Sequence, residues 1–419
     1  MHFDDALTYL LSLGHETLTI KLGLTNTVRL LGALDNPHKS FRSVQIAGTN
    51  GKGSTAVMLE SICRAAAIRV GLFTSPHLIS ITERVRIDGE PISASDFARL
   101  TQQIKQTAEE LVRRRDLQAL PTFFEHVTAI ALLAFREANV ELAILETGLG
   151  GRLDSTTAAG AQTVAITPIA MDHEEYLGHA LAEIATEKAA IIRPGVTAIV
   201  APQKSEALDV ITQRCREVGV SPIMVAAKDV GDNIRLGLRG RHQLVNAATA
   251  IALAEALRES GFAISHDAIV NGLQEAKHPG RLDLWDTQPP TLFDGAHNPA
   301  AARALRDYVN EFIHQPITIV FGAMRDKHIG EIAEILFPVA ERIVLTELDN
   351  PRAATIGQLR AAVPSNFDPA RIHEAHSVAQ ALNLAREMTE PRSLILVTGS
   401  LYLVGAVQES LVAAGAPAN

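Results

Sequence analysis

A glycine-rich segment, GTNGKGS at residues 48–54, has the residue types that hold a polyphosphate. Its glycines let backbone N–H groups converge on an anion, and Lys52 supplies a full positive charge. The β-branched residues before the segment predict a strand. The pattern after it predicts a helix, whose N-terminus adds about half a positive charge. The spacing departs from the strict GxxxxGKS/T phosphate loop, so an ordinary glycine-rich turn is the alternative interpretation.

Other side chains that follow predicted strands could hold a hard cation. Ser75 follows one strand, Glu146 ends another, and Asp172 and His173 follow a third. Because α/β sheets bind ligands at the carboxyl ends of their strands, these groups can converge above the phosphate loop. Such groups would suit Mg²⁺, which prefers oxygen ligands. The alternatives are a turn serine before a proline at position 75 and a plain buried histidine at position 173.

The elements that would position these residues alternate along the chain. Apolar strand-like runs separated by helical patterns predict an α/β fold, with a mainly parallel sheet in a P-loop-type N-terminal domain. Runs such as ITIVFG and SLILVTG predict a smaller, Rossmann-like, doubly wound C-terminal sheet. The residues Gln-Pro-Pro at 288–290 indicate the end of a linker. We therefore expect domains at residues 1–284 and 291–419, joined by a linker at 285–290.

Composition excludes several classes of protein. The chain has 419 residues, of which 47% are hydrophobic and 20% charged, as in ordinary globular proteins of two or three domains. No apolar run approaches the roughly 20 residues of a membrane span. The net charge of −9 argues against a nucleic-acid groove. The acidic start and the isolated Cys63 and Cys215 argue against export and a disulfide framework, so we expect a cytoplasmic protein.

Segments spread over nearly the whole chain resemble the dihydrofolate synthase and folylpolyglutamate synthase branch of the Mur ligase superfamily. In order, they are GTNGKGS, TSPHL, ETGLGGRLD, MDH, EKAAI, HQxxNAATA, GRLD, DGAHNP and TGSLYLVG. The resemblance implies a monomeric, ATP-dependent ligase that adds L-glutamate to dihydropteroate, to reduced folates, or to both, through an acyl phosphate. A folylpolyglutamate synthase alone, a P-loop small-molecule kinase, a nucleotide-gated binding module and a peptidoglycan Mur enzyme are the alternatives.

The resemblance implies a nucleotide and metal site around the phosphate loop. Two Mg²⁺ ions are expected, and the implied ligands are Ser75, Glu146, His173 and Lys188. Lys188 would carry a carbamate derived from CO₂, and Lys52, Lys188 and His297 would be catalytic. The residues implied to bind ATP are Gly48, Thr49, Asn50, Gly51, Lys52, Gly53, Ser54, Asn246, Arg281 and Asp294.

For two of these residues the sequence pattern offers another interpretation. A lysine among alanines and isoleucines, such as Lys188, also fits a side chain that snorkels to the surface. Here EKAAI stands where many relatives read EKAGI, a change that spares the lysine. Asn246 lies at the start of a predicted alanine-rich helix, so its amide could cap that helix instead of reading adenine.

The resemblance also implies a pterin pocket in the N-terminal domain. Its residues would be Lys21, Leu22, Gly23, Leu24, Arg84, Thr122, Phe123, Phe124, Glu125, Leu153, Asp154 and Ser155. For several of them the residue pattern alone also fits a purely structural role. Residues 21–24 could be packing, Thr122 and Glu125 could cap a helix, and the two phenylalanines could be core residues. Arg84 could belong to a solvated loop.

In the C-terminal part, the resemblance assigns roles to residues at predicted strand ends. Arg281 would contact the ATP phosphates, Asp294 the ribose, and His297 the reacting centre. Because these residues lie beyond Lys52 on the other side of the predicted linker region, we expect ATP to bridge the domains and closure to be required for turnover. Candidates for the glutamate site or the domain contact are Ser400, Tyr402, Arg325, Asp326 and Lys327.

Overall fold

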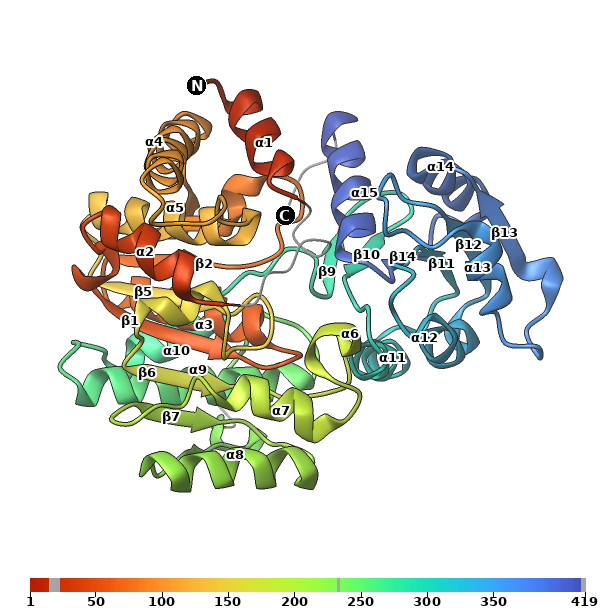
Figure 1. Ribbon diagram of the computed structural model, residues 1–419. Coiled ribbons are helices and arrows are strands. Elements are labelled where there is room, and N and C mark those ends of the chain that lie inside the picture. Colours follow the sequence, from red (N-terminus) through yellow and green to blue (C-terminus); the bar gives the residue numbers. More distant parts are fainter. Residues whose placement is uncertain (15–22, 232–233, 416–419) are drawn as a thin grey trace. The chain divides into compact units, whose positions relative to one another are not determined.

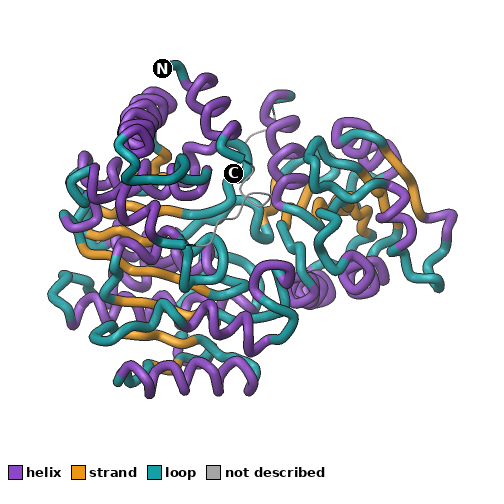
Figure 2. Tube along the Cα trace, in the orientation of Figure 1, coloured by secondary structure: helices purple, strands orange, loops and turns teal. Residues whose placement is uncertain are grey.

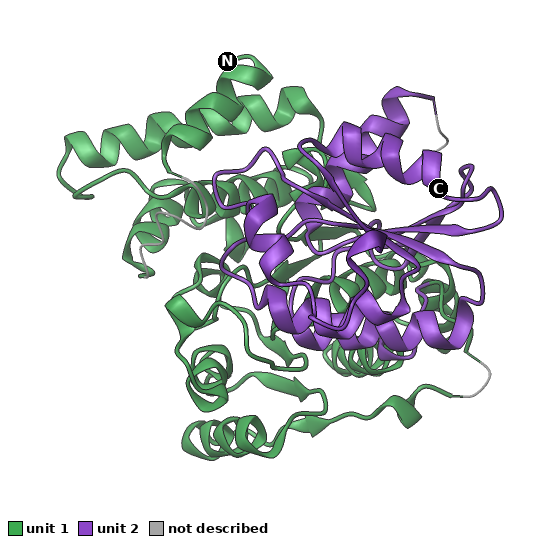
Figure 3. Ribbon diagram, turned by 90° about the vertical axis from the view of Figure 1, so that its right-hand side faces the viewer, with its two compact units in different colours: residues 1–237, 244–276 green, residues 238–243, 277–419 purple. Residues whose placement is uncertain are grey.

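The computed structural model describes residues 1–14, 23–231 and 234–415, and the chain forms two compact units. The first unit contains Met1–Gly237 and Leu244–Ala276, and the second contains Leu238–Gln243 and Lys277–Asn419 (Figure 3). The chain therefore passes between the units three times, after positions 237, 243 and 276.

The first unit is built on an eight-stranded sheet. Its strands are β1 (Arg42–Ala47), β2 (Val70–Phe73), β3 (Val85–Ile87), β4 (Glu90–Pro91), β5 (Leu142–Glu146), β6 (Thr163–Ile166), β7 (Thr197–Val200) and β8 (Ile223–Met224). They lie in the order β4-β3-β2-β5-β1-β6-β7-β8. Within the run β2-β5-β1-β6-β7-β8, each pair of neighbouring strands is parallel. Strand β3 pairs antiparallel with both β2 and β4. Because β2, β5, β1 and β6 are consecutive and parallel, their carboxyl ends form one continuous edge.

Helices cover both faces of this sheet (Figure 1). They are α1 (Phe3–Ser12), α2 (Thr25–Ala33), α3 (Lys52–Ala65), α4 (Ala94–Arg113), α5 (Phe123–Glu137), α6 (Glu174–Leu177), α7 (Leu181–Ala189), α8 (Ser205–Val218), α9 (His242–Glu259) and α10 (His266–Glu275), with a 3₁₀ helix, η3, at Ser155–Ala159. Helices α5, α7 and α8 share cores with one face of the sheet. Helix α3 lies on the other face with α10 packed against it.

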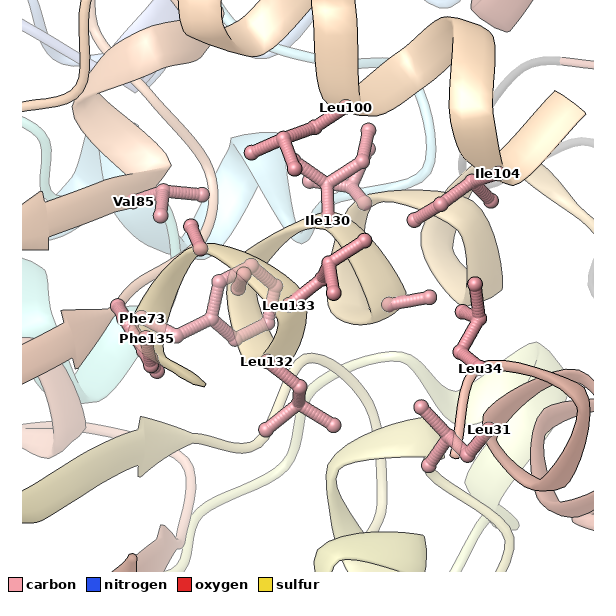
Figure 4. Packing of buried hydrophobic residues seen from close by; sticks show 14 of the residues in the cluster. Leu31, Leu34, Phe73, Val85, Leu100, Ile104, Ile130, Leu132, Leu133 and Phe135 are labelled. Atoms are coloured by element: carbon pink, nitrogen blue, oxygen red, sulfur yellow. The ribbon is translucent and has the colours of Figure 1, made fainter. Parts of the chain in front are cut away.

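Helix α5 lies at the centre of a large apolar cluster of the first unit. Its sequence, FFEHVTAIALLAFRE, is apolar around nearly the whole circumference, and a helix of this composition is buried. It lies between the sheet on one side and α2 and α4 on the other. Figure 4 shows this packing through Leu31, Leu34, Phe73, Val85, Leu100, Ile104, Ile130, Leu132, Leu133 and Phe135.

The second unit has a six-stranded sheet and five α-helices among its described residues. The strands are β9 (Asp283–Trp285), β10 (Thr291–Asp294), β11 (Ile317–Phe321), β12 (Arg342–Thr346), β13 (Ile372–Ala375) and β14 (Leu394–Thr398), in the order β13-β12-β11-β14-β10-β9. Only β9 is antiparallel to its neighbour. The helices are α11 (Pro299–Phe312), α12 (Ile329–Leu336), α13 (Ile356–Ala361), α14 (Val378–Met388) and α15 (Leu401–Ala413). The alternation of strands and helices is visible in Figure 2.

The predicted α/β class, with two mainly parallel sheets, is confirmed. The strand expected before Ser75 is β2, Val70–Phe73. An Asp-Gly turn joins β3 to β4: Asp88 and Gly89 both have positive φ, 51° and 92°, as a two-residue type I′ hairpin turn requires. Among the described residues, no helix has the length and apolarity needed to cross a membrane.

The structure differs from the predicted linker at residues 285–290. Trp285 ends β9 and pairs with Thr291 of β10, so residues 286–290 form the loop of a hairpin within the second unit. The physical reason is burial: Trp285 is only 4% exposed, and its ring packs edge-on against Phe293 at 5.2 Å between centroids. The prolines therefore mark a hairpin loop, and the final passage between the units lies after Ala276.

Candidate active site

The phosphate loop, residues 48–54, joins β1 to α3 and is fixed by the segment that follows β6. The backbone N–H groups of Thr49 and Asn50 both donate to Pro168 O at 3.1 Å. Thr49 Oγ1 donates to Ala170 O at 3.0 Å and accepts from Ala170 N at 3.1 Å. The first half of the loop is therefore anchored by four hydrogen bonds to one neighbouring segment.

The second half of the loop has the features of an anion site. Thr55 N donates to Gly51 O in the first backbone hydrogen bond of α3. The amide groups of residues 52–54 therefore come before the helical hydrogen bonds and point toward the helix N-terminus. Lys52 Nζ, the positive charge of the loop, donates to Thr49 O at 3.2 Å. Gly48 has φ +145°, and a Cβ there would come within 2.8 Å of the Thr167 carbonyl oxygen, so this position requires glycine.

Ser75 and Glu146, predicted as metal ligands, lie together. Ser75 follows β2, and Glu146 ends the adjacent strand β5. The Ser75 backbone N–H donates to Glu146 Oε2 at 3.2 Å. The Glu146 side chain is nearly buried, with 6% of the residue exposed. A buried carboxylate beside a hydroxyl-bearing residue is a group of hard oxygen donors at the edge of the sheet where the phosphate loop also lies.

Asp172 and His173 lie beyond the segment that anchors the phosphate loop. His173 precedes α6 in a left-handed conformation, with φ 52°, and its backbone N–H donates to Asp172 Oδ1 at 2.9 Å. The His173 Nε2 atom is 4.0 Å from that same oxygen. Asp172 is 7% exposed. The anchoring contacts of Pro168 and Ala170 thus connect the position of this pair to that of the phosphate loop.

Lys188 lies in the last turn of α7, and its side chain is buried. Burial and, after it, the positive charge of Lys52 lower the pKa of its ammonium group to about 7, against the opposing effect of Asp172 and other carboxylates. Lys188 therefore lies within the electrostatic reach of both the phosphate loop and the His173 segment. Its amine is largely neutral in mildly alkaline solution, and a neutral amine is a nucleophile.

These groups fit a divalent cation only in part. Within the described residues, no three His, Cys, Asp or Glu side chains gather closely enough to hold a metal ion by themselves. The oxygens of Ser75 and Glu146 suit Mg²⁺, which usually keeps several waters and binds through one or two carboxylates together with substrate phosphates. The chemistry of this donor set therefore fits Mg²⁺ bound together with a polyphosphate.

The predicted capping box at Thr122 is confirmed. Glu125 N donates to Thr122 Oγ1, and Glu125 Oε2 accepts from Thr122 N at 2.7 Å. The other carboxylate oxygen of Glu125 accepts from Thr27 Oγ1 of α2 at 3.2 Å. Glu125 therefore caps α5 and ties it to α2, which fixes the orientation of the two phenylalanines that begin α5.

Phe123, Phe124 and Arg84 form adjoining contacts at the start of α5. Arg84 is 2% exposed, its guanidinium lies 5.4 Å from the Phe123 ring centroid, and its Nε donates to His77 Nδ1 at 2.8 Å. The Phe124 ring lies 5.8 Å from the ring of Phe73. Phe123 is 4% exposed and Phe124 is half-buried. Arg84 is thus a buried residue and does not belong to a solvated loop.

Asp154 and its neighbours are held by a buried polar network. Asp154 Oδ1 accepts from Thr156 N and Oγ1, at 3.0 and 2.5 Å, and Oδ2 accepts from Leu149 N at 2.9 Å. Burial raises the pKa of this carboxyl group, while these hydrogen bonds lower it. Ser155 Oγ shares a hydrogen bond with Thr128 Oγ1 of α5 at 2.7 Å, and Leu153 is half-buried. Both oxygens of Asp154 thus have partners within the chain.

Of the remaining first-unit candidates, Lys21 and Leu22 are outside the described residues. Gly23 and Leu24 immediately precede α2, and Leu24 is its N-cap. Asn246 lies within the first turns of α9 and is buried, with its carboxamide against Gly51 of the phosphate loop. It does not occupy the N-cap position, because α9 begins at His242.

Arg281 and Asp294 of the second unit are held close together. Asp294 ends β10, and its two oxygens accept from Leu282 N at 2.9 Å and from Ala296 N at 3.0 Å. Leu282 has φ 45°, so Asp294 stabilises a left-handed residue directly after Arg281. Burial lowers the pKa of His242, against the raising effect of the Asp294 charge, with the Arg281 charge lowering it further. His242 therefore lies within the electrostatic reach of both Asp294 and Arg281.

The other second-unit candidates follow strand ends. His297 Nδ1 lies 2.8 Å from Gly295 O, just beyond β10. Ser400 follows β14, the strand next to β10, and is buried; its Oγ caps α15 by accepting from Tyr402 N at 3.1 Å. The hydroxyl of Ser400 thus holds the start of the helix on which Tyr402 lies.

Arg325, Asp326 and Lys327 follow β11, and the structure adds a residue that the sequence pattern did not single out. Arg352, in the loop after the adjacent strand β12, donates through Nη2 to both carboxylate oxygens of Asp326, at 2.9 and 2.8 Å. Lys327 Nζ is 3.9 Å from Asp326 Oδ2. Arg352 lies well beyond the end of β12, at Thr346, so its sequence position gave no local signal for this pairing.

The fold and the phosphate loop together define a Mur-type ligase. Residues 280–401 match the family model described as "Mur ligase, glutamate ligase domain". A solved structure similar to this chain is a bifunctional folylpolyglutamate synthase/dihydrofolate synthase with Mn, AMPPNP and L-glutamate bound. The TM-score is 0.85 and the identity 32%, over 98% of each chain.

Curated relatives identify the branch of that superfamily. The chain is 33% identical to the dihydrofolate synthase/folylpolyglutamate synthase of Bacillus subtilis, over 95% of this chain and 97% of the relative. It is 34% identical over its full length to a probable bifunctional folylpolyglutamate synthase/dihydropteroate synthase of Haloferax volcanii, of which it spans about half, 51%. The chain belongs to the dihydrofolate synthase/folylpolyglutamate synthase family.

Proposed function

We propose that the protein is an ATP-dependent amide ligase that adds L-glutamate to dihydropteroate, to (tetrahydro)folyl-glutamates, or to both. The observation that carries the proposal is the single sheet edge that bears the Lys52 phosphate loop and the Ser75–Glu146 pair, with the buried Lys188 of α7 within electrostatic reach of Lys52. The full-length similarity to enzymes of this activity supports the identity of the substrates.

The chemistry follows from the poor reactivity of a carboxylate, whose leaving group would be oxide. In the proposed reaction, the γ-phosphoryl group of ATP moves to a carboxylate oxygen of the pterin substrate, which gives an acyl phosphate and ADP. The glutamate amine then attacks the acyl carbon, inorganic phosphate leaves with the bonding electron pair, and the nitrogen loses a proton. Lys52 and the amides of residues 52–54 would stabilise the negative charge on the phosphates.

Ser75, Glu146, His173 and Lys188 would hold magnesium in this site. When bound, the metal neutralises phosphate charge during phosphoryl transfer. The chain's own contribution is to keep the carboxylate of Glu146 next to Ser75 through their hydrogen bond. The contacts of Thr49 with residues 168–170 would likewise hold the phosphate loop at a constant distance from His173.

Lys188 would act as an anion after carbamylation. In that step the neutral amine nitrogen bonds to the carbon of CO₂, and the displaced N–H proton goes to solvent. The lowered pKa of about 7 supports this reaction, because a lysine with the ordinary pKa of 10.5 is almost entirely protonated at neutral pH. The product is a carboxylate-like group, which a buried site beside cations favours over a second ammonium.

The proposed activity can be tested with purified protein, ATP, Mg²⁺ and labelled glutamate. Dihydropteroate and tetrahydrofolate are offered separately, and products are identified by mass. Glutamate conjugates of both would support the bifunctional enzyme, and a conjugate of tetrahydrofolate alone would restrict it to folylpolyglutamate synthesis. A phosphorylated product formed without glutamate would refute the ligase and favour a small-molecule kinase. Lys52→Ala should reduce the rate at least 100-fold, as expected when a phosphate-stabilising charge is removed.

Carbamylation is tested separately by NMR after equilibration with ¹³C-bicarbonate. The wild-type protein should give a carbamate carbon signal that Lys188→Gln removes. The exposed Lys204 provides the matched control, since Lys204→Gln should leave the signal in place. A signal that survives Lys188→Gln, or none in a wild-type enzyme that is active, would refute the carbamate.

A further inference from the structure

The last turn of α7, which carries Lys188, is held by the loop that follows β5. Arg152 of that loop donates its backbone N–H to Glu187 O at 2.9 Å. Glu187 lies in the last turn of α7, where backbone carbonyl groups have no partner within the helix. This hydrogen bond therefore caps the end of α7 at the residue directly before Lys188.

The side chain of Arg152 makes a second attachment to the same residue. Its Nε and Nη2 atoms lie 3.0 and 2.9 Å from Glu187 Oε1. A guanidinium group near the C-terminal end of a helix also interacts favourably with the carbonyl dipoles there. Arg152 thus holds both the backbone and the side chain of Glu187, which restricts how far the last turn of α7 can shift or rotate.

Gly151 brings the same loop into direct contact with the backbone of α7. A Cβ atom at position 151 would lie 2.9 Å from Glu187 O and 3.1 Å from Lys188 O. On its other side, Gly151 O accepts from Thr157 Oγ1 at 2.7 Å, and Gln45 Nε2 of β1 lies 2.7 Å from that hydroxyl. The loop is therefore backed by the sheet and cannot move away from α7 without breaking these contacts.

We propose that Arg152 is a positioning residue for Lys188, which it holds through Glu187 and the last turn of α7. The inference rests on the proposed carbamylation of Lys188. The loop that bears Arg152 starts directly after Glu146, the last residue of β5, so the attachment fixes the lysine relative to a second proposed magnesium ligand. Lys188 is 5% exposed, and a shift of its turn would move its amine relative to the edge of the sheet.

An exposed arginine could instead bind a carboxylate of the substrate directly. The side chain of Arg152 is 53% exposed, so solvent reaches it despite the ion pair. The two roles predict different results. Loss of a positioning residue should change the carbamate of Lys188 and the turnover number, and leave substrate affinity as it was. Loss of an arginine that contacts substrate should raise the KM for that substrate and leave the carbamate unchanged.

The experiment equilibrates the full chain with increasing ¹³C-bicarbonate at constant pH and follows the Lys188 carbamate signal by NMR. In Arg152→Gln, the bicarbonate concentration at half occupancy should rise about fivefold, the upper range for an exposed ion pair. Arg152→Lys keeps the charge and loses the two-atom contact, so it should recover part of this loss. Gly151→Ala, which forces the loop and the α7 backbone apart without a change of charge, should raise the concentration about tenfold or more.

Steady-state kinetics, with the pterin substrate that the product assay identifies, supply a second readout. At low bicarbonate, Arg152→Gln should lower kcat about fivefold and leave the KM for the pterin and for glutamate within about twofold of wild type. Saturating bicarbonate should restore most of the lost kcat. Arg99→Gln is the matched control, because Arg99 is 51% exposed and pairs with Glu137 at 2.6 Å in the same unit. Its carbamate occupancy, kcat and thermal melting should match those of the wild type.

The inference is overturned if Arg152→Gln has the carbamate occupancy of the wild type at every bicarbonate concentration, whether or not a substrate KM rises. An equal loss in Arg99→Gln would also overturn it, because any exposed ion pair would then have the effect. Failure of the proposed ligase activity gives a different result: the carbamate signal and its dependence on Arg152 would be present, and no glutamate conjugate would form. A wild-type protein without a carbamate signal would overturn the inference together with its premise.

Discussion

A buried histidine in α5 should make the first unit sensitive to acid. His126 is fully buried, its Nδ1 lies 3.0 Å from Thr122 O, and its Nε2 lies 3.1 Å from the hydroxyl of Tyr9 in α1. Because a carbonyl oxygen can only accept, Nδ1 carries the proton and Nε2 accepts from Tyr9. The ring is therefore neutral. Lys105 of α4 lies over the Tyr9 ring, 4.8 Å from its centroid, and is paired with Glu109.

The magnitude follows from the pKa of His126. Burial lowers it from 6.5 to about 4, against the raising effect of its backbone hydrogen bonds. Since the folded pKa is below the unfolded one, the unfolded state binds more protons between these values. The contribution of the neutral His126 ring to the free energy of unfolding is fully present above pH 6.5 and is lost as the pH falls to 4. Between pH 8 and pH 5 the free energy of unfolding should fall by about 2 kcal/mol through this residue alone.

The assay compares wild type with His126→Gln by urea denaturation at pH 8 and pH 5, followed by far-ultraviolet circular dichroism. The difference in free energy of unfolding between the two proteins should change by about 2 kcal/mol between the two pH values. The change should favour the variant at pH 5. Trp285, the only tryptophan, reports the second unit by fluorescence and separates the two transitions. His266 of α10 is exposed, so His266→Gln should follow the wild type at both pH values.

The reasoning is refuted if wild type and His126→Gln differ in free energy of unfolding by the same amount at pH 8 and at pH 5. It is also refuted if His266→Gln reproduces the change, because the effect would then not require burial.

Three further substitutions test individual parts of the site. Gly48→Ala should lower ADP affinity at least tenfold in calorimetry, because a Cβ at φ +145° meets the Thr167 carbonyl; unchanged affinity would contradict the close approach. Asp294→Asn leaves one of two backbone N–H groups without an acceptor and should destabilise the second unit by about 1–3 kcal/mol in tryptophan-monitored urea unfolding; a stability equal to wild type would argue against both bonds. Thr122→Ala should lower the free energy of unfolding of the first unit by about 1 kcal/mol because the α5 cap is lost. Thr122→Ser should retain most of that stability, because serine can also cap the helix.

Local sequence patterns are sufficient to predict the strands and turns that carry the site. The phosphate loop, Ser75 and Glu146 could be found because each stands at the end of an apolar strand-like run, and parallel strands share an edge. The capping box of α5 could be found because its two residues lie three positions apart. In each case the information lies within a few neighbouring residues.

Features that depend on contacts between distant segments could not be predicted. The contact of Asn246 with Gly51 joins α9 to the loop before α3, and no local pattern reports it. Arg352 pairs with Asp326 only because the loops after β11 and β12 meet. The linker predicted at residues 285–290 differs from the structure because prolines occur in turns as well as in linkers. Pairing with β10 decides between the two, and a single segment does not reveal pairing.

The three passages of the chain between the units have a practical consequence for dissecting the protein. Residues Leu238–Gln243 belong to the second unit: Arg239 donates to Leu282 O, and Arg241 pairs with Glu311 at 2.7 Å. A fragment that starts at Lys277 would therefore lack six residues of its own fold and leave Leu282 O and Glu311 without these donors. Supplying residues 238–243 as a separate peptide should raise the melting temperature of such a fragment, so a cut at one position cannot yield two intact halves.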